Sequence, residues 1–362
     1  MNKLQVAIIG CGGIANGKHL PSLSKIDQVE IVAFCDLIVE RAEQAADKYG
    51  HPGAKVFDDY RELLANPSID VVHICTPNDS HAEISIAALE AGKHVMCEKP
   101  MAKTAADARR MAEAAKRTGK KLTIGYNNRF RADSQYLKKV VEEGELGHIY
   151  LAKAHAVRRR GVPTWGVFLD EDKQGGGPLI DIGTHALDLT MWLMNNYEPK
   201  VVLGVTYHQL SRKHNAANSW GSWDPDKFKV EDSAFAMVIM RNGATIMVES
   251  SWALNTLDTK EAKCTLCGTE GGADMQDGLR INGEKYGRLY VNQLQFEAKG
   301  ADFYDGKKES MSDKEIRMWI EAIIDDKELI VTPEQACVVS EVLEAIYESN
   351  RTGRAVYFDE SN

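Results

Sequence analysis

Two aspartates and a histidine stand at helical spacing in the stretch Gly175–Asp188, which reads GGGPLIDIGTHALD. Residues four and seven apart lie on one face of an α-helix, so Asp181, His185 and Asp188 are expected to project together. A histidine beside a carboxylate can transfer protons near neutral pH, which suits acid–base catalysis. The same pattern is compatible with a helix cap at Asp181 and a core histidine at His185. The rest of the sequence is needed to distinguish the catalytic from the structural interpretation.

Polar residues also follow two short apolar segments in the first third of the chain. The segment 71–75 is followed by Thr76, Pro77, Asn78 and His81, and the segment 94–97 is followed by Glu98 and Lys99. In open α/β sheets, ligands bind beyond the carboxyl ends of the strands. Lys99 is therefore placed to reach the reactive end of a bound ligand, although a solvated loop lysine would show the same pattern.

The N-terminus carries the pattern of a dinucleotide-binding turn. An apolar strand, 4–9, leads into GCGGIA at residues 10–15, and a second apolar strand, 30–35, ends at Asp36. The glycines permit a tight turn and let backbone amides approach a pyrophosphate, while Asp36 can bond the adenosine ribose and repel a 2′-phosphate. The sequence therefore predicts NAD rather than NADP. The residues expected to contact it here are Gly10, Gly12, Gly13, Ile14 and Asp36.

The periodicity of the chain predicts two domains. Strand and helix patterns alternate through residues 1–124, which predicts a doubly wound parallel sheet, a Rossmann domain. From residue 125 onward, a helix at 132–143 precedes alternating strands that look antiparallel, with a hairpin signal at Asn242-Gly243, so residues 125–362 are expected to form a second α/β domain. Capping signatures at Ser80–Glu83, Thr104–Asp107, Ser312–Glu315 and Thr332–Gln335 predict four helix starts, the last two for the closing helices.

Composition excludes several classes of protein. The formal net charge of -9 over 362 residues offers no electrostatic case for binding nucleic acid. No apolar run approaches the length of about 20 residues that spans a membrane. Cys264 and Cys267 have a zinc-like spacing without a second ligand pair, so no metal is expected. The seven cysteines are predicted to be free thiols in a reducing, cytoplasmic compartment.

A long loop, RRRGVPTWGVF at residues 158–168, precedes the glycine-rich stretch. Long loops in compact domains are usually functional or disordered, and the aromatic and basic content argues against disorder. Arg158 and Arg159 are candidates for a substrate clamp with Trp165 beside them. A solvated basic turn would explain the arginines equally well.

The predicted strands between Ser233 and Trp252 carry apolar side chains on both faces. One face is needed to cover helices of the same domain, and the other also needs cover. We therefore expect a homo-oligomer built on this sheet.

In combination, these motifs resemble those of the Gfo/Idh/MocA oxidoreductase family. The resemblance rests on GxGGIA, TPNxxH, CEKP, GYNNRF and GGGPLIDIGTHALD in this order, and it covers essentially the whole chain. It implies a Rossmann domain followed by an α/β domain with a large, open, mostly antiparallel sheet that often packs against another subunit. It also implies a nicotinamide cofactor and a sugar, inositol or related substrate.

Carried over by motif, the resemblance assigns roles to individual residues. The catalytic residues are Lys99, Asp181 and His185. The residues near the cofactor include Thr76, Pro77, Asn78, His81, Glu98, Lys99, Asn127 and Trp165. Lys99, Asp181 and His185 are also expected to meet the substrate. The long loop adds Arg158, Arg159 and Trp165 as candidates from its basic and aromatic composition.

The expected reaction oxidises or reduces a ring secondary hydroxyl of a sugar, glycoside or inositol. His185 takes the proton, Lys99 stabilises the alkoxide and Asp181 orients His185, while hydride passes to the nicotinamide. Two alternatives stay open. One is an NAD-using glycosidase of the same family, which oxidises, eliminates and reduces again. The other is a non-enzymatic NAD-dependent sensor, which would not need the proton relay.

Overall fold

The computed structural model describes residues 3–296 and 309–358. The chain divides into two compact units, Met1–Phe130 with Lys308–Cys337 and Arg131–Lys307 with Val338–Asn362. The domain boundaries 1–124 and 125–362 stay a prediction. The compact units differ from them because a helix near the C-terminus packs its apolar side chains, including Ile316 and Ile320, into the core of the first unit.

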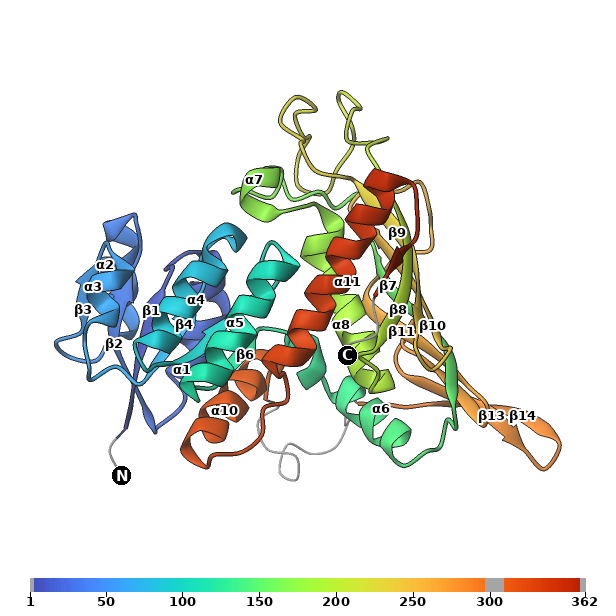
Figure 1. Cartoon of the computed structure of the whole chain (residues 1–362), viewed down its shortest axis with the longest axis horizontal. Helices are drawn as coiled ribbons and strands as arrows, with labels where there is room; N and C mark the ends of the chain where they lie inside the picture. Colours follow the sequence, from blue (N-terminus) through green and yellow to red (C-terminus); the bar gives the residue numbers. More distant parts are fainter. Residues whose placement is uncertain (1–2, 297–308, 359–362) are drawn as a thin grey trace. The chain divides into compact units, whose positions relative to one another are not determined.

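The first unit contains a six-stranded sheet in the order β3-β2-β1-β4-β5-β6, with every neighbouring pair parallel (Figure 1). Its strands are β1 (Leu4–Ile9), β2 (Val29–Cys35), β3 (Lys55–Phe57), β4 (Val71–Ile74), β5 (His94–Cys97) and β6 (Leu122–Ile124). The predicted doubly wound sheet is confirmed. The strand order reverses between β1 and β4, and the carboxyl ends of these strands form the edge at which such sheets bind ligands.

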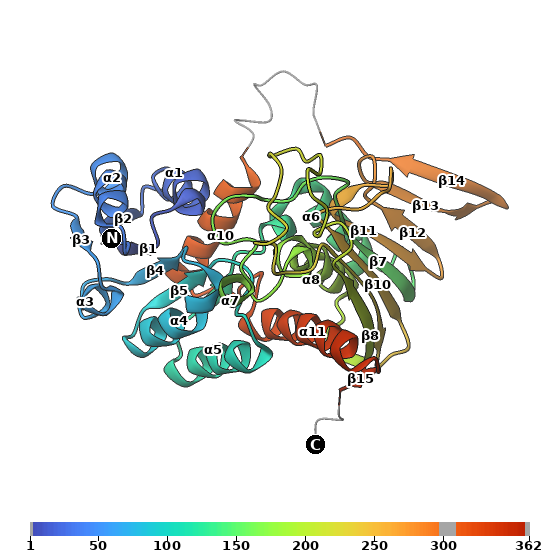
Figure 2. The same cartoon turned by 90° about the horizontal axis from the view of Figure 1, so that it is seen from above.

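Helices cover both faces of this sheet. They are α1 (Leu20–Leu23), α2 (Val39–Tyr49), α3 (Tyr60–Leu64), α4 (His81–Glu90), α5 (Ala105–Thr118) and α10 (Met311–Ile324). A π-helical turn, η1 (Ala15–His19), and two 3-10 turns, η2 (Asn78–Ser80) and η3 (Asn127–Phe130), complete the unit. Figure 2 shows α1, α2 and α10 on one face of the sheet and α4 and α5 on the other.

Helix α10 begins earlier than its capping signature predicts. The hydroxyl of Ser310 accepts a hydrogen bond from the N–H of Asp313 at 3.1 Å and caps the helix, so the predicted start at Ser312 is wrong. A cap two residues earlier satisfies the exposed N–H groups of the first turn. Glu315 therefore lies inside the helix, where it is buried.

Of the other three capping signatures, the one at Thr332 is confirmed, because its hydroxyl accepts the N–H of Gln335 at 3.3 Å. The Thr104 hydroxyl accepts from the N–H of Asp107 at 3.1 Å, so this predicted cap is confirmed. The Ser80 hydroxyl instead donates to Thr76 Oγ1 at 2.7 Å and caps no helical N–H group. The predicted helix start at Ser80 is confirmed, but the capping box does not form, because the hydroxyl faces the preceding loop.

The second unit is built on a nine-stranded sheet in the order β14-β13-β12-β11-β7-β10-β9-β8-β15. Its strands are β7 (Ile149–Val157), β8 (Pro199–Tyr207), β9 (Ser233–Met240), β10 (Thr245–Ser251), β11 (Lys260–Gly268), β12 (Gly271–Asp274), β13 (Arg280–Lys285), β14 (Arg288–Gln293) and β15 (Val356–Tyr357). Within the described part of this sheet, β7 and β10 form the one parallel pair, so the expected mostly antiparallel sheet is confirmed. The hairpin predicted at Asn242-Gly243 joins β9 to β10.

Helices lie on one face of this sheet. The helical segments of the second unit are α6 (Ala132–Glu142), α7 (Glu171–Gln174), the π-helical turn η4 (Leu179–Gly183), α8 (Thr184–Met194) and most of α11 (Pro333–Thr352). Helix α8 packs on β7. Ala152, Ala154 and Ala156 of β7 are fully buried, and their small side chains let the helix approach the strand closely. In Figure 2 the opposite face carries no helix of the described chain.

No helix in the described ranges is long and apolar enough to cross a membrane. The seven cysteines are free, and no group of three or more His, Cys, Asp or Glu side chains in the described ranges could hold a metal ion. The cytoplasmic location stays a prediction.

Candidate active site

The turn after β1 is shaped to bring the backbone close to a ligand. Gly10 has a φ of +89°, and a Cβ there would lie 2.7 Å from the Cys75 carbonyl, so only glycine fits. At Gly12 and Gly13 no heavy atom lies within 4 Å of the place that a Cβ would take. The predicted open approach to the backbone amides is therefore present, and η1 follows it directly.

Asp36 holds this turn from the end of β2. One carboxylate oxygen accepts the N–H of Cys11 at 2.8 Å, and the other accepts the N–H of Ile38 at 2.9 Å. Ile14 on the turn and Leu37 and Ile38 beyond Asp36 are exposed apolar side chains. An exposed apolar surface beside a carboxylate fits the flat ring and ribose of adenosine, and the open turn fits a pyrophosphate. The residues present thus fit NAD.

His81 fastens the segment after β4 to the Lys99 loop. Its Nε2 lies 2.9 Å from the carbonyl oxygen of Thr76, and its Nδ1 lies 2.8 Å from that of Pro100. Burial lowers the pKa of the ring, and the two carbonyls oppose this only in part. Because both ring nitrogens face backbone oxygens, His81 supports the predicted cofactor segment from behind. On that segment, Thr76 is half-buried, Pro77 exposed and Asn78 buried.

Lys99 follows β5 at the carboxyl edge of the sheet and is half-buried. The preceding carboxylate, Glu98, is turned inward, with Oε1 at 2.7 Å from Lys18 Nζ and 2.8 Å from His19 Nε2. Burial alone would raise the pKa of Glu98, but Lys18 and His19 outweigh it, so the pKa lies well below its ordinary value. Half-buried Asn127 begins η3 just beyond β6, the neighbour of β5. The structure therefore brings Glu98, Lys99 and Asn127 to one edge of the first sheet.

In the second unit, the glycine-rich stretch packs too tightly for larger residues. A Cβ at Gly176 would lie 2.0 Å from Tyr347 Oη, and a Cβ at Gly177 would lie 2.3 Å from the carbonyl oxygen of Glu231. This tight turn leads into η4, which carries Asp181. Single π-helical turns are frequent at functional sites.

A buried carboxylate that no sequence motif indicates, Glu231, fixes the start of η4. It accepts the N–H groups of Gly177 at 2.8 Å and Leu179 at 3.1 Å, and the hydroxyl of Tyr347 at 2.9 Å. Burial raises the pKa of Glu231 to about 7, although the three donors work against this rise. Glu231 lies far along the chain from the motif, in a loop before β9, so sequence spacing could not identify it.

Asp181 is oriented by groups of the second unit. Its Oδ2 accepts the indole N–H of Trp252 at 3.1 Å and lies 4.0 Å from Arg158 Nη1. Asp181 and His185 are half-buried, whereas Asp188 is fully buried in α8. The expected common face assumes a regular α-helix, and the π-turn between Asp181 and α8 changes that spacing. The joint projection of the three side chains stays a prediction.

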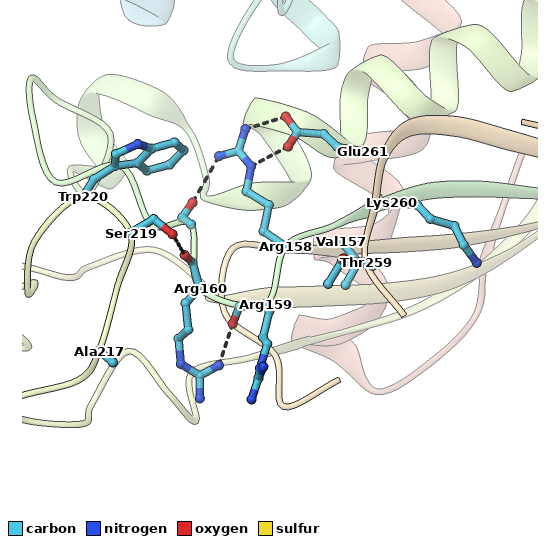
Figure 3. A pocket seen from close by; sticks show the side chains of 11 residues that line it. Val157, Arg158, Arg159, Arg160, Ala217, Ser219, Trp220, Thr259, Lys260 and Glu261 are labelled. Carbon is cyan, nitrogen blue, oxygen red and sulfur yellow. Dashed lines mark hydrogen bonds and ion pairs between the residues drawn. The ribbon is translucent and has the colours of Figure 1, made fainter. Parts of the chain in front are cut away.

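A cavity of about 740 Å³ lies at the end of β7. Its lining includes Arg158, Arg159, Arg160, Ser219, Trp220, Lys260 and Glu261 (Figure 3). Arg158 points toward Glu261 and bonds it through Nε at 2.6 Å and through Nη2. Arg160 braces the loop, with Nη1 at 2.6 Å from the Arg159 carbonyl oxygen. The exposed guanidinium of Arg159 makes no hydrogen bond or ion pair with the described part of the chain.

Aromatic rings connect Asp181 with the rim of this cavity. Trp252, which donates to Asp181, packs against Phe168 with 6.3 Å between the ring centroids. Phe168 in turn packs against Trp165, with 5.9 Å between the ring centroids. Trp165 and Trp220 lie 5.1 Å apart and are about half exposed. Trp165 thus belongs to an aromatic wall of the second unit, and its contact with the cofactor stays a prediction.

Comparison with known protein families assigns both parts of the chain. A model described as "Oxidoreductase family, NAD-binding Rossmann fold" matches residues 4–126, and the C-terminal alpha/beta domain of the same family matches residues 138–358. The chain belongs to the Gfo/Idh/MocA oxidoreductase family, as its motifs indicated. Its first unit is an NAD-binding Rossmann domain.

Several characterised relatives are enzymes. The chain is 36% identical over 357 residues to D-glucoside 3-dehydrogenase from Escherichia coli (strain K12), covering 98% of this chain and 97% of the relative. It is 34% identical over 194 residues to inositol 2-dehydrogenase from Salmonella typhimurium, covering 53% and 55%. The crystal structure of aldose-aldose oxidoreductase from Caulobacter crescentus, complexed with glycerol, superposes with a TM-score of 0.79 at 27% identity, covering 99% and 100%. The prediction of an NAD-dependent oxidoreductase is confirmed.

Proposed function

We propose that this enzyme oxidises or reduces a ring secondary hydroxyl of a sugar, glycoside or inositol. The cavity beside Asp181 carries the proposal, because it combines charged groups with an aromatic wall. Polyhydroxylated rings offer hydroxyls to the charged groups and a C–H face to tryptophan. An apolar alcohol would leave buried polar groups unpaired, at about 1–3 kcal/mol each. The names of the relatives support the same substrate class.

The proposed chemistry uses three side chains. His185 takes the proton from the substrate hydroxyl, and the cation of Lys99 stabilises the negative charge that develops on the oxygen. Asp181, whose carboxylate is held by Trp252, orients His185 or bonds a neighbouring hydroxyl. NAD, when bound, supplies the hydride acceptor.

The substrate class is tested by incubating the purified protein and NAD with D-glucose, methyl D-glucoside, levoglucosan, myo-inositol and ethanol. Mass spectrometry should show a keto product together with an equal amount of NADH for at least one sugar or cyclitol. Net glycoside hydrolysis without NADH would indicate the glycosidase reaction instead. Oxidation of ethanol alone would overturn the proposal.

The catalytic assignment is tested by Lys99→Ala and His185→Ala. Each is expected to lower single-turnover hydride transfer about 10²–10⁴-fold, the usual contribution of a positioned acid–base group. Calorimetric titration should show NAD binding retained, because neither side chain is needed to hold the adenosine half. Lys55→Ala and His148→Ala, at exposed positions, are the matched controls. Near-wild-type transfer in either active-site variant would remove that residue from the mechanism.

We also propose a homo-oligomer that buries the helix-free face of the second sheet. Leu203 on β8, Met237 on β9 and Met247 on β10 are paired in register, so they form one row across three strands. Leu203 is 46% exposed and Met247 is 38% exposed, although both are apolar. Contiguous exposed apolar surface of this kind marks an interaction site.

A further inference from the structure

Behind Lys99, the first unit contains a cluster of five titratable side chains that are almost fully buried. Lys18 Nζ lies 2.7 Å from Glu98 Oε1 and 2.9 Å from Glu315 Oε2 on α10. These three residues are 5%, 6% and 2% exposed. His19 and His73, both at 0% exposure, extend the cluster through a contact of 2.8 Å between their Nδ1 atoms.

Lys18 is the one cation among these five side chains when both histidines are neutral. Burial lowers the pKa of both histidines, so they are neutral at pH 7. His19 then donates Nε2–H to Glu98 and accepts Nδ1–H from His73. His73 Nε2 is left as a buried acceptor without a partner among the described residues. One lysine therefore faces two carboxylates.

Such a cluster is a poor source of stability. Removing charges from water costs several kcal/mol per ion, and apolar replacements of buried ion pairs are often neutral or stabilising. An unpaired buried acceptor adds a further penalty. The presence of this arrangement immediately behind a strand-end motif therefore points to a role in the site itself.

The cluster reaches Lys99 through the two oxygens of Glu98. Oε1 is held by Lys18 and His19, while Oε2 accepts the backbone N–H of Lys99 at 3.2 Å. The carboxylate is also confined by Gly125, where a Cβ would lie 3.0 Å from Oε1. A shift of Lys18 or Glu315 would thus move the backbone from which the Lys99 side chain extends.

We propose that Lys18 and Glu315 are positioning residues that fix Glu98 and, through its carboxylate, the backbone of Lys99. The proposal rests on the catalytic role proposed for Lys99. Helix α10, which follows the whole second sheet in the sequence, then contributes directly to the active-site edge of the first unit. Since a displacement of about 1 Å can lower a rate about 10²-fold, a change in this cluster should affect turnover more than binding.

The test uses the double variant Lys18→Met/Glu315→Leu, which removes one cation and one carboxylate together and keeps the buried charge from increasing. Its melting temperature should stay close to that of the wild type. With NAD and whichever sugar of the panel turns over fastest, kcat should fall at least about tenfold, while KM for NAD and its calorimetric Kd change less than about twofold. Glu321→Gln, on the same helix but half exposed in a pair with Arg317, is the matched control.

Lys18→Arg is a second variant that retains the charge. A planar guanidinium is larger than an ammonium and presents its donors in a different geometry, so Glu98 and Glu315 should shift from their present contacts with Lys18. We therefore expect kcat to fall here as well while the protein stays folded. Wild-type kcat in either folded variant would overturn the positioning role. Lys99→Ala, measured in parallel, separates the two proposals: full turnover in Lys99→Ala removes the catalytic assignment itself.

Discussion

At the scale of single residues, Asp36 combines a structural and a predicted ligand-binding task. Each carboxylate oxygen already accepts one backbone N–H and keeps a lone pair for a ribose hydroxyl. We expect Asp36→Ser to lower NAD affinity about tenfold or more, since hydrogen bonds to a charged group are worth about 1.5–3 kcal/mol. The preference for NAD over NADP should narrow, because the repulsion of a 2′-phosphate is lost. Calorimetry with both cofactors measures this, and equal affinity of the wild type for the two would contradict it.

Arg159 is the candidate residue for recognising an acidic group on the substrate. Its side chain is the arginine of the loop left without a partner in the described ranges, and guanidinium binds carboxylate in a bidentate fork. If the substrate is acidic, Arg159→Ala should raise KM for a uronate about tenfold and leave KM for the neutral sugar unchanged. Competition between a sugar and its uronate in the wild type and the variant distinguishes the cases. Equal effects on both sugars would show that Arg159 recognises no carboxylate.

The roles of the three loop arginines could not be predicted from the local sequence. The run Arg158-Arg159-Arg160 predicts positive charge, and a clamp and a solvated turn fit it equally. The structure separates the residues because their partners come from about a hundred positions away, including Glu261 for Arg158 and Asn255 for Arg160. Such partners follow from strand pairing over long distances and leave no local signal.

At the scale of elements, local signals predicted the strands and most helices well. The glycine turn after β1, the Thr104 cap and the hairpin at Asn242-Gly243 depend on backbone geometry that the local residues determine. The π-helical turns η1 and η4 were not predicted, because apolar periodicity does not distinguish a π-turn from the α-helix that follows it. The difference matters at Asp181, because η4 changes the helical spacing between Asp181 and the residues of α8.

The turn into η4 should make stability depend on pH through Glu231. Its pKa is raised from 4.5 to about 7, so the folded state keeps a proton that the unfolded state releases between these values. The contribution of this group is fully present below pH 4.5 and is lost as the pH rises to about 7. At about 1.4 kcal/mol per pH unit, the loss amounts to about 3 kcal/mol.

Urea unfolding of the wild type and Glu231→Gln at pH 5 and pH 8 measures this contribution. The wild type should lose more stability than the variant between the two pH values, because glutamine does not titrate. Glu284→Gln, at an exposed position on β13, should behave like the wild type. The same loss of stability in Glu231→Gln and in the wild type would exclude Glu231 as its source.

At the scale of the whole molecule, the C-terminal helices return to both units. Helix α10 contributes Glu315 to the cluster behind Lys99, and α11 contributes Tyr347 to the turn before Asp181. Capping signatures predicted both helices, but they could not indicate which unit each helix joins. That depends on burial against strands far earlier in the chain: Ile316 shares a core with Val6 and Ile8, and Ile346 on α11 lies against Gly204 on β8.

The exposed apolar row on the second sheet also predicts that the protein assembles into a homo-oligomer. The row Leu203–Met237–Met247 lies on the face without helices, and a charge in this row would be buried without a partner in an oligomer. We expect the wild type to scatter light as a multiple of 40.1 kDa at micromolar concentration, and Met247→Glu to shift the protein toward the monomer. Leu257→Glu introduces the same charge at an exposed loop position outside the row and should leave the mass unchanged. A monomeric wild type would show that this face is open to solvent and that the sheet needs no partner.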